Sequence, residues 1–285
     1  FKTAGFPNDV FRTLLVTGKK IGGVIEDERV AAVTLTGSTP AGISAGTSAA
    51  KKIKKVVLEL GGSDPYIVFD DADLDQAVDS IVTSRMINSG QSCIAAKRFI
   101  VHSKVKTEFT KSLVKRFEHI TMGDPTIEGN MIGPQAKTEL RDELHEQVKK
   151  SVNKGATLLI GGEIPDLEGS YYPPTLLTEV KKGMPAFDEE MFGPVGAIIE
   201  FSNDDEALEL ANDSEFGLGS AIFTKDHDRI ERFVRELQAG SVFVNHFVKS
   251  DPRLPFGGVK QSGHGRELSD FGIHEFVNIK TVSMK

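Results

Sequence analysis

The stretch Val30-Ala31-Ala32-Val33-Thr34-Leu35-Thr36-Gly37-Ser38-Thr39-Pro40 decides the fold. Its first seven residues are apolar or β-branched, which is typical of a strand. A glycine turn follows, and Ser38 or Thr39 is suited to the N-cap of a helix whose first turn accepts Pro40. The stretch therefore predicts a strand that leads through a tight turn into a helix.

Strands and helices alternate around this stretch. Strands are predicted at 11–16, 30–36 and 56–60, and helices at 19–28 and 41–54. The order βαβαβ is typical of one half of a doubly wound parallel sheet.

The composition changes at Ser63-Asp64-Pro65, and a second series of α/β elements follows. Strands are predicted at 66–69, 98–102, 157–160, 197–201, 220–223 and 241–245. Helices are predicted at 74–88, 106–119, 135–153, 204–212 and 226–237, the first of them capped by the acids at 70–73. The pattern favours two α/β domains, 1–61 and 62–261, and a return segment, 262–285, whose residues 276–284 resemble a strand without a partner.

Composition excludes several classes of protein. The 285 residues are 39% hydrophobic and 26% charged, as in an ordinary soluble globular protein. A net charge of −7 disfavours a nucleic-acid surface, and no apolar run approaches the ~20 residues that span a bilayer. A single cysteine excludes an intrachain disulfide framework and favours a reducing, cytoplasmic location. The chain begins at Phe1, which suggests a segment of a longer protein.

Cys93 lies in the polar, glycine-containing loop Asn88-Ser89-Gly90-Gln91-Ser92-Cys93. A structural cysteine usually lies among apolar residues, whereas a reactive one needs access and backbone N–H groups for an oxyanion. From this loop alone, Cys93 could be either a nucleophile or an inert cysteine. The seven histidines are scattered, so no Cys-His pair stands out, and the pattern predicts no metal site.

Glu59 is the best candidate for a base. It is the one charge in the otherwise apolar strand 56–60 and lies at its carboxyl end, where open α/β sheets bind ligands. Apolar surroundings would raise the pKa of its carboxyl group towards the working pH. The alternative is a glutamate on the exposed side of an edge strand.

Three further stretches carry polar or aromatic side chains suited to a ligand. Gly37-Ser38 offers backbone N–H groups at a helix start, either an anion site or only a helix cap. Glu190 and Phe192 precede a Gly-Pro break. Either Glu190 accepts hydrogen bonds from sugar hydroxyls while Phe192 packs on a ring, or the stretch is an acidic surface turn with Phe192 in the core. The loop 255–263 is rich in glycine and is expected to cover a site or to wrap a partner.

Together these stretches resemble the aldehyde dehydrogenase superfamily. The resemblance rests on Val33-Thr34-Leu35-Thr36-Gly37-Ser38, Leu58-Glu59-Leu60-Gly61-Gly62, Gly90-Gln91-Ser92-Cys93, Glu189-Glu190-Met191-Phe192-Gly193-Pro194-Val195 and Pro255-Phe256-Gly257-Gly258-Val259-Lys260-Gln261-Ser262-Gly263. They occur in the family's order and at its spacing across essentially the whole chain. The fold that this implies is a partial doubly wound nucleotide-binding domain, an α/β catalytic domain and a C-terminal oligomerisation strand.

The resemblance implies the roles of individual residues. Cys93 would be the nucleophile, Glu59 the general base, and Gly37 and Ser38 the contact to the pyrophosphate of NAD or NADP. Glu190 would hold the nicotinamide ribose, and Leu60 and Phe192 would contact the same cofactor. The reaction implied is the oxidation of an aldehyde to a carboxylate through a thiohemiacetal and a thioester, with the Cys93 N–H as one oxyanion donor.

The family also carries an N-terminal half that supplies an oxyanion asparagine and a lysine for the adenosine ribose. Neither precedes Phe1, so the resemblance places this chain in the C-terminal part of such an enzyme.

Within the family, residues 248–258 and 266–269 most resemble bacterial succinate-semialdehyde dehydrogenases. Ser250 stands where those enzymes place a serine against the substrate carboxylate. An arginine found six residues before the cysteine in some members is Ile87 here, while Arg85 lies nearby.

Succinate semialdehyde is therefore the expected substrate, with a broader range of short-chain aliphatic aldehydes as the alternative. A non-catalytic family member with an assembly role and a cysteine hydrolase are the competing classes. The unpartnered strand at 276–284 predicts a homodimer or homotetramer.

Overall fold

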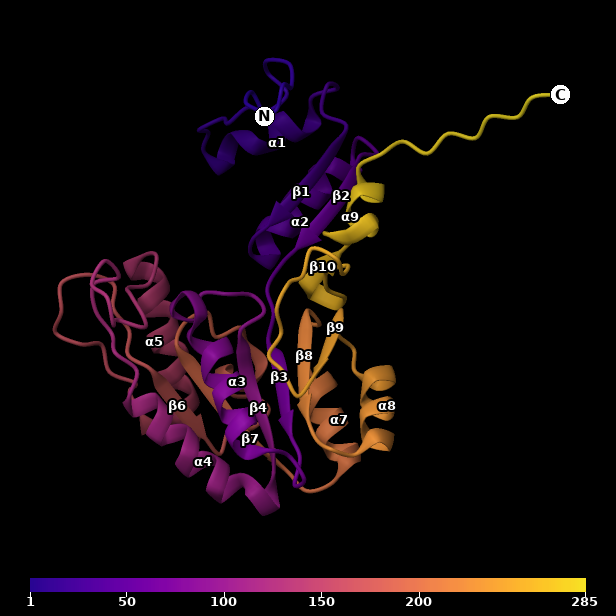
Figure 1. Cartoon of the computed structure of the whole chain (residues 1–285). Helices are drawn as coiled ribbons and strands as arrows, with labels where there is room; N and C mark the ends of the chain where they lie inside the picture. Colours follow the sequence, from indigo (N-terminus) through magenta and orange to yellow (C-terminus); the bar gives the residue numbers. More distant parts are fainter.

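The computed structural model describes all residues 1–285 and arranges them around two sheets (Figure 1). A small sheet has the strand order β1-β2-β10, and a seven-stranded sheet has the order β5-β6-β7-β4-β3-β8-β9. Both are built mainly of parallel strands, which confirms the predicted α/β class.

The small sheet pairs β1 (Ala32–Thr36) in parallel with β2 (Lys55–Glu59). Helices α1 (Gly18–Glu26) and α2 (Thr39–Ala50) pack on it through Ile25, Ala45 and Ala49. Helix α2 begins at Thr39, two residues earlier than predicted, with Ser38 at its N-cap and proline in its first turn. The short strand β10 (Gly263–His264) returns from the far end of the chain and pairs antiparallel with β2.

The strand predicted at 11–16 is wrong. This segment has no ladder hydrogen bonds, and Leu15 is 97% exposed. Apolar and β-branched residues form a strand only where a neighbouring strand and a packing surface are available. Within these 285 residues β1 is the edge of the small sheet, so the predicted βαβαβ unit is reduced to one parallel pair.

The large sheet is the core of the rest of the chain. Its strands are β3 (Asp64–Val68), β4 (Ala96–His102), β5 (Thr157–Ile160), β6 (Thr175–Thr178), β7 (Val195–Phe201), β8 (Gly219–Phe223) and β9 (Ser241–Val244). Only the edge strand β5 runs antiparallel to its neighbour. The sequence does not predict strand β6, because Pro173 and Pro174 precede it and indicate a loop.

Both faces of the large sheet are buried, as expected for parallel strands. On β3, Tyr66 and Val68 face one core cluster and Ile67 faces the other. The helices are α3 (Leu74–Met86), α4 (Ser103–Glu118), α5 (Thr138–Asn153), α6 (Pro185–Asp188), α7 (Asp204–Asn212), α8 (His227–Glu236) and α9 (Ser269–Glu275). Asp73 caps α3 as predicted, because its carboxylate accepts a hydrogen bond from the Gln76 N–H at 3.1 Å.

The chain passes from the small sheet to the large one between Glu59 and Asp64, and returns at Gly263. The domain limits 1–61, 62–261 and 262–285 remain a prediction. None of the helices is both long and apolar enough to cross a membrane.

Residues 276–285 do not form a strand in this chain. They extend away from both sheets (Figure 1), and Ile279, Val282 and Met284 are 80%, 72% and 90% exposed. A strand needs a ladder partner, and none lies within reach of this tail. Pairing with a second subunit therefore remains a prediction.

Candidate active site

The cysteine loop, residues 88–95, begins where α3 gives way to a single 3₁₀ turn, Ile87–Gly90. Asn88 and Ser89 have φ values of 52° and 56°, and Gly90 has 76°. A Cβ at Gly90 would lie 2.2 Å from the Gly193 carbonyl carbon. Only glycine fits there, because the backbone of the cysteine loop lies directly on the segment that carries Glu190 and Phe192.

A distant segment fixes the shape of this loop. The Ser89 hydroxyl accepts a hydrogen bond from the Gly133 N–H at 2.9 Å, and the Gln91 side-chain oxygen accepts one from the Ala136 N–H at 2.7 Å. Three consecutive left-handed residues persist only where surrounding contacts hold them. These contacts cross more than forty positions of sequence.

Cys93 is partly exposed and is a free thiol. Its backbone N–H donates no hydrogen bond within the chain, so it is available to a ligand. Burial raises the pKa of the thiol, as do the Asp64 and Glu190 carboxylates, while Lys97 and the Ile94 N–H lower it. The thiol is therefore partly accessible, and its ionised form depends on stabilisation by nearby donors and positive charge.

Two buried cations hold the carbonyl groups of the cysteine loop. Arg85, from α3, donates to the Gly90 carbonyl. Lys97, from β4, donates to the carbonyls of Ser92 at 3.0 Å and Cys93 at 2.8 Å. Sequence reasoning missed Lys97, although a Lys-Arg pair between Ala96 and Phe99 in an apolar strand was a visible signal.

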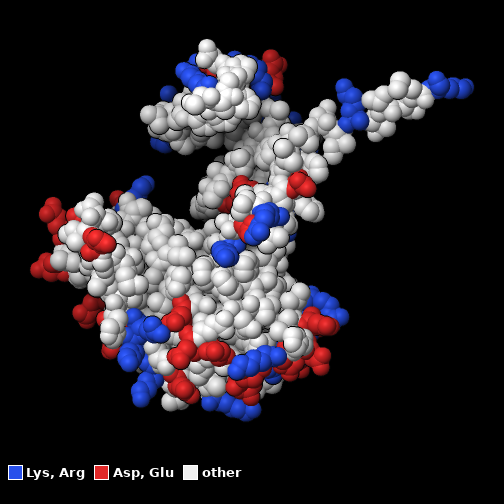
Figure 2. All heavy atoms as spheres, viewed as in Figure 1, with Lys and Arg blue, Asp and Glu red and all other residues white.

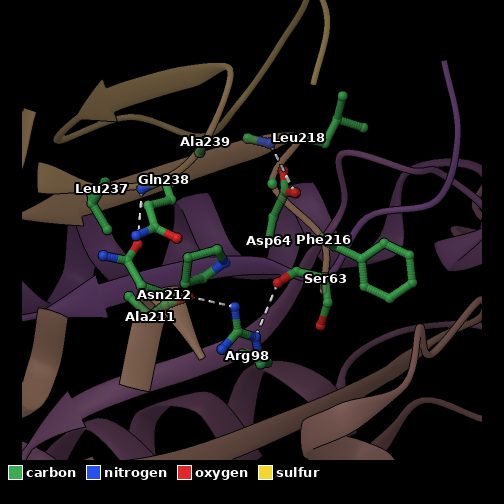
Figure 3. Close-up of a pocket in the computed structure, with 13 residues that line it drawn as sticks. Ser63, Asp64, Arg98, Ala211, Asn212, Phe216, Leu218, Leu237, Gln238 and Ala239 are labelled. Carbon is green, nitrogen blue, oxygen red and sulfur yellow. Dashed lines mark hydrogen bonds between the residues drawn. The ribbon is translucent and has the colours of Figure 1, made fainter. Parts of the chain in front are cut away.

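Arg98 points to the opposite face of β4, because side chains alternate along a strand. Figure 3 shows its guanidinium beside Ser63, whose carbonyl it contacts at 3.0 Å, and beside Ala211, at 2.8 Å. Asp64 lies across the same small cavity and accepts a hydrogen bond from the Gly219 N–H at 3.0 Å. This network anchors the turn that follows Gly61 and Gly62.

Glu59 is buried, with 2% of its surface exposed, so the edge-strand interpretation is wrong. Strand β10 covers it by pairing Gly263 opposite it, and a Cβ at Gly257 would lie 2.7 Å from Glu59 Oε1. The glycine-rich loop thus lies against Glu59. Neither carboxylate oxygen has a hydrogen-bond partner. Burial, with the nearby Glu267 carboxylate, raises the pKa of Glu59 to about 7.

Glu190 lies beside the cysteine loop. Its Oε1 accepts a hydrogen bond from the Gly62 N–H at 3.0 Å and lies 3.6 Å from Lys97 Nζ. A Cβ at Gly62 would lie 2.5 Å from the Cys93 carbonyl oxygen. The Gly61-Gly62 turn thus brings the end of β2, Glu190 and Cys93 together.

The residues predicted to contact a cofactor lie in two places. Phe192 is 37% exposed and follows Glu190, whereas Leu60 is 4% exposed and packs against Gly42 of α2. Gly37 and Ser38 are exposed at the start of α2, and the Ser38 hydroxyl does not cap the helix. The Ser38 and Thr39 N–H groups have no partner in the chain, so this end of a twelve-residue helix suits a phosphate group.

Ser250 lines a cavity of about 160 Å³ together with Ser92 and Ile94, the two neighbours of Cys93. Ile87 and Lys249 line it as well. Arg85 does not, because it is fully buried and turned towards Gly90. Lys249 is the one charged residue that lines this cavity.

Space-filling representation shows a hollow between the part built on the small sheet and the part built on the large sheet (Figure 2). Most of the charged side chains in this view lie on the outer surface of the large-sheet part. The chain thus contains a partly exposed thiol, a buried carboxylate of raised pKa and a helix N-terminus with unpaired N–H groups.

Comparison with known proteins identifies the family of this chain. The sequence pattern of the aldehyde dehydrogenase family matches residues 1–282, and the chain belongs to that family.

Two relatives are both named succinate-semialdehyde dehydrogenases. The chain is 50% identical over 282 residues to a probable NADP⁺ enzyme of Synechocystis, covering 99% of the chain and 62% of that protein. It is 51% identical over 282 residues to an NAD(P)⁺ enzyme of Escherichia coli K12, covering 99% of the chain and 61% of that protein.

Solved structures give the same result for the fold. The succinic semialdehyde dehydrogenase of Streptococcus pyogenes, crystallised with NADP⁺, matches with a TM-score of 0.96 and 38% identity. The match covers 99% of this chain and 62% of that one. The chain therefore spans about three fifths of the length of the relatives that it matches.

Proposed function

We propose that this chain supplies the nucleophile and the base of an NAD(P)-dependent aldehyde dehydrogenase that converts succinate semialdehyde to succinate. The observation that carries the proposal is the placement of Cys93, with its free N–H, beside Glu190 at the turn that follows Glu59. The names of the relatives support the same reaction and NAD or NADP as cofactor.

The first half of the reaction belongs to Cys93. Its thiolate adds to the aldehyde carbon, and the carbonyl oxygen becomes an alkoxide that the Cys93 N–H is free to stabilise. The alkoxide then collapses, the carbon loses hydride, and a thioester of Cys93 remains. A bound nicotinamide ring supplies the hydride acceptor for this step.

The second half belongs to Glu59. A carboxylate with a pKa of about 7 is partly ionised at neutral pH and is still a useful base. It takes a proton from water as the water attacks the thioester carbon, and the Cys93 thiolate leaves. The carboxylic acid formed ionises to succinate, and the free thiolate can begin again.

The residues of this chain suit the cofactor that the reaction requires. The exposed N–H groups at the start of α2 would hold a phosphate, and the half-buried Glu190 carboxylate would accept hydrogen bonds from ribose hydroxyls. Phe192 would lie against the same end of the cofactor. Leu60 would contribute its backbone, because its side chain is buried under α2.

The aldehyde would occupy the cavity that Ser250 and Lys249 line. The Ser250 hydroxyl would donate to the distal carboxylate of the substrate, and the Lys249 ammonium would balance its charge. The alternative of a broad aliphatic aldehyde dehydrogenase predicts no preference for that carboxylate. A non-catalytic role is disfavoured because the chain retains both Cys93 and Glu59.

The change Ser250→Ala tests the substrate. A hydrogen bond to a charged group contributes about 1.5–3 kcal/mol, so kcat/KM for succinate semialdehyde should fall about 10–100-fold. Butanal, which has no carboxylate, should react nearly as before. Production of reduced cofactor at 340 nm measures both in the full-length enzyme. Lys249→Met serves as a second variant, and equal losses with both aldehydes would favour the broad-specificity alternative.

We also propose that the enzyme is a homo-oligomer, a dimer or tetramer, held in part by the tail. Removal of residues 276–285 takes away exposed apolar side chains that include Ile279 and Met284. Light scattering should then report a smaller particle than the intact enzyme. An unchanged mass after truncation would contradict a role of this tail in assembly. With one cysteine in the chain, a reducing cytoplasm remains the expected location.

A further inference from the structure

Lys97 is unusual in being a lysine with only 1% of its side chain exposed. Its ammonium donates to the carbonyl oxygens of Ser92 at 3.0 Å and Cys93 at 2.8 Å, and reaches Ala95 at 3.4 Å. Burying an ammonium is costly unless it is paired and hydrogen-bonded, so the bonds that Lys97 makes to this loop call for an explanation. None of the family motifs described above contains Lys97.

These bonds at 3.0 and 2.8 Å hold the direction of two peptide groups, and the Ala95 N–H also donates to the Ser92 carbonyl at 3.2 Å. In a trans peptide, the C=O of one residue and the N–H of the next point to opposite sides. The chain has no cis peptide bond. A Ser92 carbonyl turned inward to Lys97 therefore turns the Cys93 N–H outward, and that N–H has no partner within the chain.

The second peptide group acts on the sulfur. Because the Cys93 carbonyl also points to Lys97, the Ile94 N–H points away from Lys97 and interacts with the Cys93 sulfur. Without the lysine, the Cys93 carbonyl would lose its donor and the Ser92 carbonyl would keep only the Ala95 N–H, so the peptide group after Cys93 would be free to rotate and the one before it would be held less firmly. The same side chain thus sets the oxyanion donor and one donor to the thiolate.

Charged groups from every side face this ammonium. Glu190 Oε1 lies 3.6 Å away, and Asp64, on β3, also stabilises the charged form, whereas Arg85, on α3, opposes it. Burial lowers the pKa of Lys97, and the two carboxylates raise it. The positive charge in turn lowers the pKa of the Cys93 thiol.

We propose that Lys97 is a positioning residue for the dehydrogenase reaction: its buried ammonium aims the Cys93 and Ile94 N–H groups and favours the thiolate. The proposal rests on the proposed function only for its catalytic consequence. The geometry of the cysteine loop carries the rest.

The test compares Lys97→Met with Lys97→Gln in the full-length enzyme. Methionine removes both charge and donors, whereas glutamine keeps two N–H donors for the carbonyls. The rate of alkylation of the Cys93 peptide by iodoacetamide, followed by mass spectrometry against pH, gives the thiol pKa without aldehyde or cofactor. Steady-state turnover at 340 nm gives kcat/KM.

For Lys97→Met we expect the thiol pKa to rise by about one unit and kcat/KM to fall about 10–100-fold, less than the loss of a whole oxyanion donor. Lys97→Gln should recover part of kcat/KM but little of the thiol pKa, because it restores donors without charge. Lys106→Met is the matched control, because Lys106, on α4, pairs with Glu179 and Glu200 and lies away from the loop. It should change neither quantity.

A folded Lys97→Met enzyme with an unchanged thiol pKa and unchanged kcat/KM would overturn the proposal. Two variants that both fail to fold would also overturn it, because Lys97 would then serve folding rather than positioning. If the parent enzyme oxidises no aldehyde, the proposed function fails. The alkylation profiles would still decide the effect of Lys97 on the thiol.

Discussion

Replacing Cys93 by alanine is expected to lower aldehyde oxidation by at least about 10⁴-fold, the largest effect of any single change in this chain. Loss of a covalent nucleophile removes the bond on which the whole sequence of steps depends, and what remains is catalysis by binding alone. The free N–H of Cys93 would still be present but would have no adduct to stabilise. The 340 nm assay with succinate semialdehyde measures the loss.

Two control measurements distinguish a loss of catalysis in Cys93→Ala from a loss of folding or of cofactor binding. The thermal midpoint should change little, because Cys93 is partly exposed and packs into no core cluster. Cofactor binding, followed by fluorescence, should also persist, because Glu190 and the start of α2 are untouched. Normal turnover by Cys93→Ala would contradict the proposed mechanism. Ester hydrolysis by the parent enzyme without cofactor would favour the cysteine-hydrolase class instead.

Replacing Glu59 by glutamine is expected to lower steady-state turnover by about 10²–10⁴-fold, the contribution of a well-placed general base. The first turnover should survive better, since Glu59 is needed chiefly to release the thioester. Rapid mixing should show a burst of reduced cofactor that approaches one per site, followed by a slow phase. Glu200→Gln, a change in a surface ion pair, is the matched control.

The pH dependence follows from the same carboxyl group. Glu59 acts as a base only when ionised, so release of the acid should increase as the pH rises through about 7. Glu59→Gln should lose this rise. A parent enzyme whose thioester hydrolysis did not change between pH 6 and 8 would contradict the assignment of Glu59.

Glu59 also costs stability. Its pKa is about 7 in the folded chain against an ordinary 4.5, so between these values the folded state binds more protons than the unfolded state. The free energy of unfolding therefore falls as the pH rises from 4.5 to 7, by on the order of 1–3 kcal/mol. Glu59→Gln should be more stable than the parent at pH 8 and not at pH 4.5, by thermal unfolding. An inactive but stabilised variant would identify Glu59 as a functional rather than a structural residue.

The sequence determined much of this protein by itself. Runs of apolar and β-branched residues predicted most strands to within a few residues, because most buried strands of the large sheet carry apolar side chains on both faces. The five motifs determined the family, since their order along the chain is a property of sequence. Cys93, Glu59 and Glu190 were selected because a thiol or carboxylate in a glycine turn or at a strand end is visible without coordinates.

Only the tertiary structure decided how those groups are held. Residues 11–16 have the composition of a strand but find no partner, whereas β6 forms because β5 and β7 lie on either side. The burial of Glu59 depends on β10, more than two hundred residues away. The carbonyls that Lys97 reaches are within its range only because contacts from 133–136 hold the preceding part of the cysteine loop. The local sequence determines which functional groups are present. Long-range packing determines the burial and direction of their side chains. Burial and direction in turn set the pKa of each group and the atoms that it can contact.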